Sequence, residues 1–232
     1  MNKKEYLKAV LLGLLAILIY FGINNYAALP FTLLGIDTES LSSTFKYFYT
    51  LLLDFIIAVL LIIVFRKTLI SNFKDMKKNH KQYFTTYIKY WFVALGIMMI
   101  SNLFIMLFTN TDLSNNEQII RQTFKQNPIY IFITAVILAP VIEELVFRQS
   151  FRNIITNNWL FIIISGLVFG SLHVITSYET PTDLLYLIPY SAPGIIFAYT
   201  LVKSKNIFVP MGLHFIHNGL LLSLQFVVLI FG

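Results

Sequence analysis

Long hydrophobic runs separated by short polar segments recur along the whole chain. Seven runs approach the ~20 residues that a helix needs to cross a bilayer, at residues 6–26, 47–65, 90–109, 128–150, 159–176, 183–202 and 207–231. The first run also fits a signal peptide, because Lys3 and Lys4 precede it, but the further spans behind it favour a retained helix. The pattern predicts an all-α, polytopic membrane helix bundle of about seven transmembrane helices, forming one integral membrane domain over residues 1–232.

Composition supports a membrane protein and excludes some chemistry. Hydrophobic residues make up 57% of the chain and charged residues only 12%, with a mean hydropathy of +0.75, which an ordinary soluble domain does not show. The chain has no cysteine, so disulfides, thiolate nucleophiles and thiolate metal ligands are excluded. Its Lys, Asn and Ile content and short loops are typical of a bacterial protein, so we expect it in the plasma membrane of a bacterium.

The positive charges predict an orientation. With the N-terminus inside, the inner segments of the seven-span arrangement hold 14 of the 17 Lys and Arg residues, and the outer segments hold only Lys46, Arg121 and Lys125. This places the C-terminus outside. The strongest basic cluster, residues 66–84, reads as a cytoplasmic loop containing an interfacial amphipathic helix. The net charge of the chain is +6, and its lysines lie in short loops beside hydrophobic spans. We therefore expect these lysines to contact the lipid bilayer and not nucleic acid.

Ionisable residues inside the predicted spans are few, and most fall into three motifs. A charge at the centre of a spanning helix costs roughly 2.5–3.5 kcal/mol, so such residues are functional candidates. The first motif, E-E-x-x-x-R, contains Glu143, Glu144 and Arg148. Glu144 and Arg148 are four residues apart and can neutralise each other on one helix face, whereas Glu143 is rotated by about 100° and stays free to work.

The other two motifs supply histidines at a similar depth. They are F-x-x-x-H, with Phe169 and His173, and H-x-x-x-N, with His214 and Asn218. Glu143 and His173 lie nearly the same number of residues from the turn between their spans, and a helix rises about 1.5 Å per residue. We therefore expect the motifs to converge on an intramembrane polar cavity, helped by glycines and prolines that allow close approach and free backbone carbonyls.

These residue types fit peptide hydrolysis without a covalent nucleophile. Glu143, with His173, would orient and deprotonate a water, which attacks a peptide carbonyl. His214 and the Asn218 amide would donate hydrogen bonds to the developing oxyanion. Arg148 would hold Glu144 in place. This chemistry requires neither a cofactor nor a metal.

Taken together, the three motifs resemble the CPBP family of intramembrane endopeptidases, which includes CAAX prenyl-protein proteases and bacterial Abi proteins linked to bacteriocin processing or self-immunity. The resemblance covers residues 125–220. It implies a glutamate-dependent peptidase in which Glu143 is the general base, and it assigns Glu144, Arg148, Phe169, His173, His214 and Asn218 to the family motifs. It also implies a hydrophobic or membrane-bound peptide substrate. The N-terminal spans, residues 1–110, carry no signature, and their role is unassigned.

Three alternatives stay open at this point. Glu143, His173 and His214 could bind zinc and make a metalloprotease, although H-E-x-x-H is absent. Ser165 or Ser171 could serve a hydrolase, but neither lies in G-x-S-x-G. The protein could also be a non-catalytic immunity or transport protein, with its buried charges, including the lone carboxylate Asp54, acting as an ion pair or proton relay.

Overall fold

Helices form nearly all of the chain in the computed structural model, which describes residues 2–109, 111 and 113–231. The elements are α1 (Lys3–Asn25), α2 (Leu29–Leu33), η1 (Thr38–Ser40), α3 (Ser43–Thr109), α4 (Asn115–Gln126), α5 (Pro128–Ile131), η2 (Phe132–Leu138), α6 (Ala139–Glu143), η3 (Glu144–Ser150), α7 (Phe151–Ile154), α8 (Asn158–Ile175), η4 (Pro181–Tyr186), α9 (Leu187–Ser204) and α10 (Phe208–Phe231). Six helical runs in this part of the chain are long and apolar enough to cross a membrane. The prediction of an all-α polytopic membrane bundle is confirmed.

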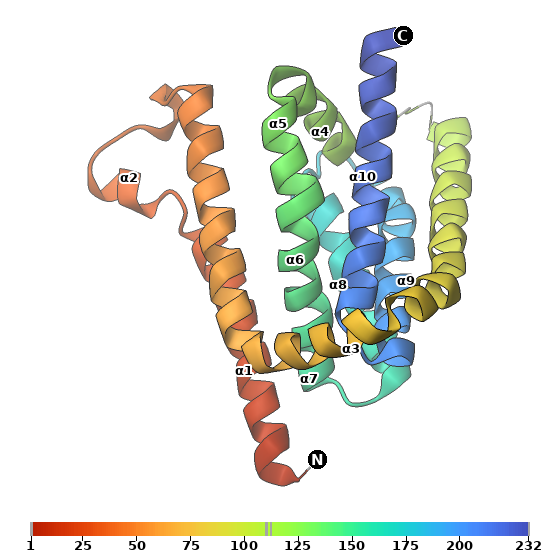
Figure 1. Cartoon of the computed structure of the whole chain (residues 1–232). Coiled ribbons are helices and arrows are strands. Elements are labelled where there is room, and N and C mark those ends of the chain that lie inside the picture. Colours follow the sequence, from red (N-terminus) through yellow and green to blue (C-terminus); the bar gives the residue numbers. More distant parts are fainter. Residues whose placement is uncertain (1, 110, 112, 232) are drawn as a thin grey trace.

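Helix α3 accounts for the difference between six helical runs and the seven predicted spans. The predicted spans 47–65 and 90–109 both lie in α3, because residues 66–84 between them are also helical. We call residues 43–65, 66–84 and 85–109 the first, middle and last limbs. The first limb descends, the middle limb runs across one end of the bundle and the last limb rises again (Figure 1). The number of membrane crossings and their orientation remain predictions.

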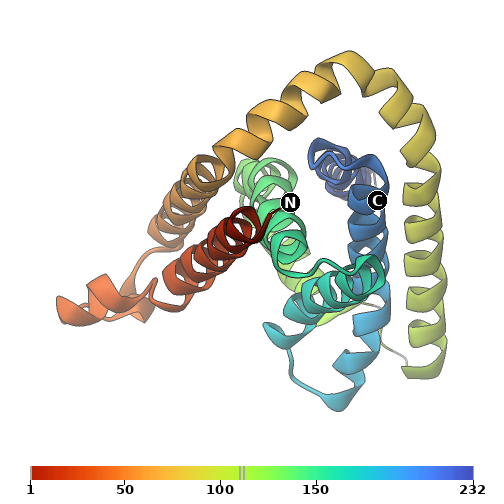
Figure 2. The same ribbon diagram turned by 90° about the horizontal axis from the view of Figure 1, so that it is seen from below.

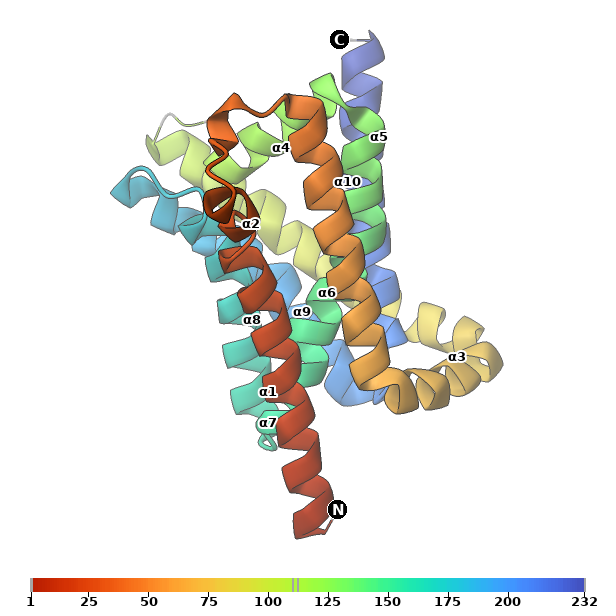
Figure 3. The same cartoon turned by 90° about the vertical axis from the view of Figure 1, so that its left-hand side faces the viewer.

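The three limbs of α3 pass around the other helices on three sides, as the view from below shows (Figure 2). The middle limb lies toward the same end of the molecule as α7 and the N-terminus, and it projects sideways from the bundle (Figure 3). The N-terminus and the C-terminal end of α10 lie at opposite ends (Figure 1).

Residues Pro128–Ile154 form one helical run in which α-helical and π-helical segments alternate. In the π-helical register the N–H of residue 140 would donate to the carbonyl of Ala135, but Pro140 has no N–H. The side chain of Asn218, on α10, donates to that Ala135 carbonyl instead, at 2.8 Å. The π segment η2 therefore depends on packing between helices. It lies before Glu143, and the second π segment, η3, begins at Glu144. Segments of this kind are frequent at functional sites.

Helices α8 and α9 pack closely because glycines face a backbone. A Cβ added to Gly166 would lie 2.7 Å from the Ile195 nitrogen, and one added to Gly170 would lie 2.7 Å from the Ser191 nitrogen. Only glycine permits this approach, which brings Phe169 and His173 on α8 close to α9. The prediction that glycines allow close helix contact is confirmed for this pair.

The N-terminal helices pack directly on the run that carries the glutamates. Ala16 of α1 and Leu61 of α3 are fully buried in one core cluster with Leu145 and Phe147 of η3. A Cβ at Gly13 would lie 2.8 Å from the Ser150 carbonyl oxygen, so α1 also approaches η3 at backbone distance. The described part of the N-terminal region is thus part of the bundle and supports the segment that holds Glu144 and Arg148.

Candidate active site

His214 lies between the two consecutive glutamates. Its Nδ1 is 3.0 Å from Glu144 Oε1, and its Nε2 is 3.7 Å from Glu143 Oε2. Adjacent residues on a helix differ by about 100° in direction, so Glu143 and Glu144 can reach the two opposite edges of one imidazole ring. The structure therefore joins the first and third motifs directly.

Glu144 also pairs with Arg148, as the four-residue spacing predicted. Arg148 Nε lies 3.3 Å from Glu144 Oε2, and both side chains are fully buried. Arg148 Nη2 donates to the Gly194 carbonyl at 3.3 Å, and its guanidinium lies 4.2 Å from the centre of the Phe169 ring. In the tautomer with the hydrogen on Nδ1, His214 donates to the Glu144 carboxylate.

Several polar atoms of this cluster have no hydrogen-bond partner among the described residues. They are Glu143 Oε2, Glu144 Oε2, Arg148 Nε and Arg148 Nη1. The Glu144–Arg148 contact is therefore an ion pair whose angles are poor for hydrogen bonding. Native proteins leave few buried polar atoms unpaired, and those that remain are candidates for functional contacts. Glu143 is also the more accessible glutamate, with 18% of its side chain exposed against none for Glu144.

His173 lies beside this cluster but does not contact Glu143. Its ring centre is 4.9 Å from that of Phe169, which in turn lies 5.8 Å from His214. Among the described residues, no hydrogen bond or ion pair joins His173 to Glu143. The predicted direct pairing of His173 with Glu143 is absent from the described conformation, and their common depth stays a prediction.

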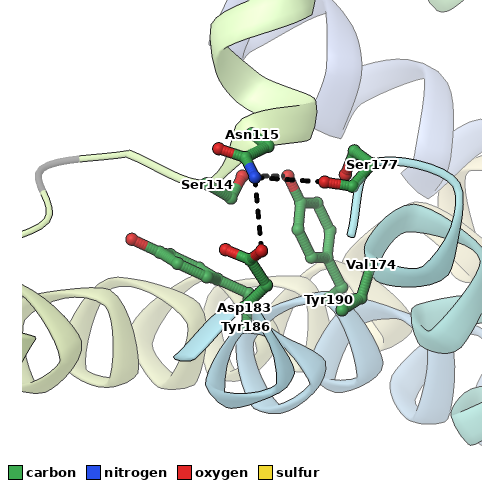
Figure 4. Close-up of a pocket in the computed structure, with 7 residues that line it drawn as sticks. All are labelled: Ser114, Asn115, Val174, Ser177, Asp183, Tyr186 and Tyr190. Atoms are coloured by element: carbon green, nitrogen blue, oxygen red, sulfur yellow. Dashed lines mark hydrogen bonds between the residues drawn. The ribbon is translucent and has the colours of Figure 1, made fainter. Parts of the chain in front are cut away.

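Tyr190 supports His173 from α9 and was not singled out from the sequence. The two rings stack at 5.0 Å with an interplanar angle of 19°. The Tyr190 hydroxyl forms hydrogen bonds with Ser114 at 2.7 Å and Asn116 at 3.1 Å, at the start of α4. Figure 4 shows this neighbourhood, in which Asn115 donates to the Ser177 carbonyl and to Asp183. A tyrosine within an apolar span gives no local signal of such a role, because its partner is distant in sequence.

The side-chain amide of Asn218 bonds to the backbone and not to the glutamates. Its Nδ2 donates to the Ala135 carbonyl, as described above, and no described hydrogen bond links it to His214 or Glu143. Its placement as an oxyanion donor next to His214 therefore remains a prediction. In the described conformation its amide stabilises the π-helical segment η2 against α10.

His217, three residues after His214, packs among aromatic rings. Its ring lies 6.5 Å from Trp91 and 6.3 Å from Phe197 in edge-on arrangements, as is typical of a histidine that packs between helices. The hydroxyls of Ser165 and Ser171 donate to the carbonyls of Phe147 and Val168. Among the described residues, neither hydroxyl forms a hydrogen bond with His173.

No group of three His, Cys, Asp or Glu side chains among the described residues is arranged to hold a metal ion. Glu143 and His214 approach each other, but His173 does not complete a ligand set with them. The zinc alternative would therefore need a rearrangement of His173.

An apolar cavity lies beside the helical run that carries the glutamates. It has a volume of about 420 Å³ and lies between the first limb of α3 and the π segment η2. Its lining side chains are apolar: Phe48, Leu51, Leu52, Phe55, Ile133 and Leu138. Leu138 precedes Glu143 by five residues, a rise of about 7.5 Å along a helix. Asp54 also lies on the first limb of α3.

Comparison with known proteins finds a family match in the second half of the chain. The sequence model of the family "Type II CAAX prenyl endopeptidase Rce1-like" matches residues 125–220. The chain is 29% identical over 115 residues to the "Putative membrane peptidase YdiL" of Bacillus subtilis, covering 48% of this chain and 43% of that protein. It is 27% identical over 159 residues to the "Membrane-embedded CAAX protease MroQ" of Staphylococcus aureus, covering 64% and 61%.

The chain thus spans about half the length of these curated relatives. No solved structure matches it. The matched segment contains every residue of the three motifs, from Glu143 to Asn218. The resemblance to CAAX-type membrane proteases is confirmed for residues 125–220, which match the Rce1-like CAAX prenyl endopeptidase model.

Proposed function

We propose that this protein is a membrane-embedded endopeptidase that cleaves hydrophobic or membrane-bound peptides with a water activated by Glu143. The observation that carries the proposal is His214 held between Glu143 and the Glu144–Arg148 ion pair within an apolar helix bundle. The names of the relatives as a membrane peptidase and a CAAX protease support it.

The proposed reaction begins at the gap between Glu143 and His214. The 3.7 Å separation of Glu143 Oε2 and His214 Nε2 is too long for a direct hydrogen bond, but one water can lie about 2.8 Å from both atoms. Glu143 takes a proton from this water as the oxygen attacks the peptide carbonyl. Glu143 later returns the proton to the leaving amine, so that the carboxylate is regenerated.

Glu144 has a positioning role in this proposal. It accepts from His214 Nδ1–H, which fixes the ring and directs Nε2 toward Glu143. In this proposal His214 enters the reaction with both ring nitrogens protonated, so that its Nε2–H donates to the oxyanion as the tetrahedral intermediate forms. We retain His173 as a further group for orienting the water and Asn218 as a second oxyanion donor, each requiring a small side-chain movement.

The substrate class follows from the surroundings of the site. A cavity lined by apolar side chains next to the glutamate run suits an apolar segment of a peptide. We include in the proposal the processing of a bacteriocin or an exported signal peptide, or a part in self-immunity, on the basis of the family alone.

The decisive experiment compares cleavage of a quenched fluorescent library of hydrophobic peptides by the wild type and by Glu143→Gln in detergent, with and without a strong zinc chelator. Glu179→Gln is the matched control, because Glu179 is an exposed glutamate outside the site. We expect the Glu143→Gln variant to be inactive and the control and chelated wild type to be active. Equal activity of wild type and Glu143→Gln would contradict the proposal. Loss on chelation with recovery on adding zinc would replace it with a metalloprotease.

A further inference from the structure

The middle limb of α3 carries a basic face that the proposed reaction does not use. Residues 66–84 contain six Lys and Arg residues and one acidic residue, Asp75. Lys67, Lys74, Lys78 and Lys81 are separated by seven, four and three residues, so they share one face of the helix. All four side chains are exposed.

A second face of the same limb is polar and points into the protein. Asn72, Asp75, Asn79 and Tyr83 are separated by three, four and four residues and form this inner face. Asp75 accepts hydrogen bonds from Asn79 at 2.7 Å, from Tyr83 at 2.5 Å and from Asn206 at 2.7 Å. The single acidic side chain is therefore enclosed by donors and does not contribute to the lysine face.

Asn206 fixes this inner face to the turn between α9 and α10. Its side chain, 1% exposed, also donates to the Asn72 carbonyl at 2.8 Å, and the Ile207 N–H donates to Asn72 Oδ1 at 2.8 Å. These bonds set the rotation of the middle limb about its own axis. The lysine face is consequently held pointing away from the bundle.

Apolar side chains adjoin the lysine face. Ile70, Phe73 and Phe84 are each more than half exposed, and Phe73 also touches Phe208 at the start of α10. Exposed aromatic and aliphatic side chains beside lysines are characteristic of helices that lie in a membrane interface. The apolar limbs on both sides of residues 66–84 belong to the same continuous helix, which restricts the middle limb to the level of the membrane surface.

We propose that the lysine face of the α3 middle limb binds the headgroups of anionic phospholipids, with the Asp75–Asn206 hydrogen bonds holding it in the binding orientation. The charge complementarity is direct, because lysines near an anionic surface attract its lipids. Ile70, Phe73 and Phe84 would enter the acyl boundary while the lysines meet the phosphates. This inference does not depend on the proposed peptidase activity.

The test uses the full-length protein reconstituted in phosphatidylcholine bilayers with a trace of spin-labelled phosphatidylglycerol or spin-labelled phosphatidylcholine. The measured quantity is the ratio of motionally restricted label for the two lipids at low salt. The test variant is Lys74→Gln/Lys78→Gln/Lys81→Gln. The matched control is Lys3→Gln/Lys4→Gln/Lys8→Gln, which removes the same charge from exposed lysines of α1 at the same end of the molecule.

We expect the wild type and the α1 control to prefer phosphatidylglycerol about fivefold, and the limb variant to lose most of this preference. Raising the salt concentration should weaken the preference of the wild type. A third variant, Asn206→Ala, should also lower the preference although it removes no charge. Equal losses in the two lysine variants would show a non-specific effect of net charge and would overturn the proposal, as would an unchanged preference in the limb variant.

Discussion

Two polar clusters in this protein are built in opposite ways. The Asp75 cluster at the middle limb consists of neutral donors around one carboxylate, and both of its oxygens accept hydrogen bonds at 2.5–2.7 Å. The Glu143–Glu144–Arg148–His214 cluster is deeply buried and charged, yet several of its oxygen and nitrogen atoms have no hydrogen-bond partner among the described residues. Saturated hydrogen bonding fits a structural attachment, whereas unsatisfied buried atoms fit a site that must bind and transform a substrate.

The largest expected effect distinguishes the two buried histidines of α10. His214→Ala should lower kcat/KM for peptide cleavage by about 10²–10⁴-fold, since it removes the group that contacts both glutamates. His217→Phe should retain most of the activity, because His217 packs against the aromatic rings of Trp91 and Phe197. Steady-state kinetics on both variants, with thermal unfolding as a check on folding, tests this difference. Equal losses would remove the distinction.

The next effect concerns stability. Arg148→Ala should destabilise the protein by about 3–5 kcal/mol, because it leaves Glu144 buried without a counter-charge. Arg152→Ala is the control, since Arg152 is only partly buried and bonds to the carbonyls of Ile155 and Thr156 at the end of the run. Denaturant unfolding in mixed micelles measures both. A normally stable Arg148→Ala protein would mean that the ion pair is unimportant for folding.

A smaller loss is expected at the attachment of the middle limb. Asn206→Ala removes two hydrogen bonds made by a buried side chain, which should cost about 1–3 kcal/mol. Peptide cleavage at saturating substrate should change far less than in His214→Ala. Hydrogen exchange should show faster opening of residues 66–84 with little change in η3. Slower exchange or no change there would contradict the assigned role.

The smallest expected effect is a pH dependence of the same attachment. Hydrogen bonds from Tyr83 and Asn206 lower the pKa of the Asp75 carboxyl below its ordinary value. A lowered folded-state pKa adds stability that is present above the unfolded pKa and is lost as the pH falls through the folded pKa. Exchange protection of the middle limb should therefore fall in acid below the usual Asp range, and Asp75→Asn should abolish that pH dependence. An unaltered acid profile in Asp75→Asn would assign it to another group.

The sequence indicated the residues of the candidate site well but their contacts only in part. The Glu144–Arg148 pair was predictable because a four-residue spacing joins side chains on one helix, and the structure confirms it. The contact of His214 with both glutamates was not predictable, because it depends on how α10 is rotated against η3. The stacking of His173 on Tyr190, in place of a contact with Glu143, depends on the glycine-mediated approach of α8 and α9.

The same division applies to the fold. Hydrophobic runs and the charges between them predicted a helical membrane bundle and an interfacial helix within residues 66–84. They did not predict that this helix continues without a break into both neighbouring spans. The π-helical register around Pro140 could likewise not be predicted from the local sequence, because it depends on a hydrogen bond from Asn218, on a distant helix, to the Ala135 carbonyl.

By itself, the sequence determined that this chain is an all-α membrane protein, which residues carry charge inside it and which of them pair within one helix. These properties depend on composition and on the fixed periodicity of a helix, so they can be read along the chain. The tertiary structure alone decided that His214 joins both glutamates, that Asn218 bonds to Ala135 and that the lysines of the middle limb face outward. Each of these depends on the relative rotation and depth of helices far apart in sequence, which packing fixes and local periodicity does not.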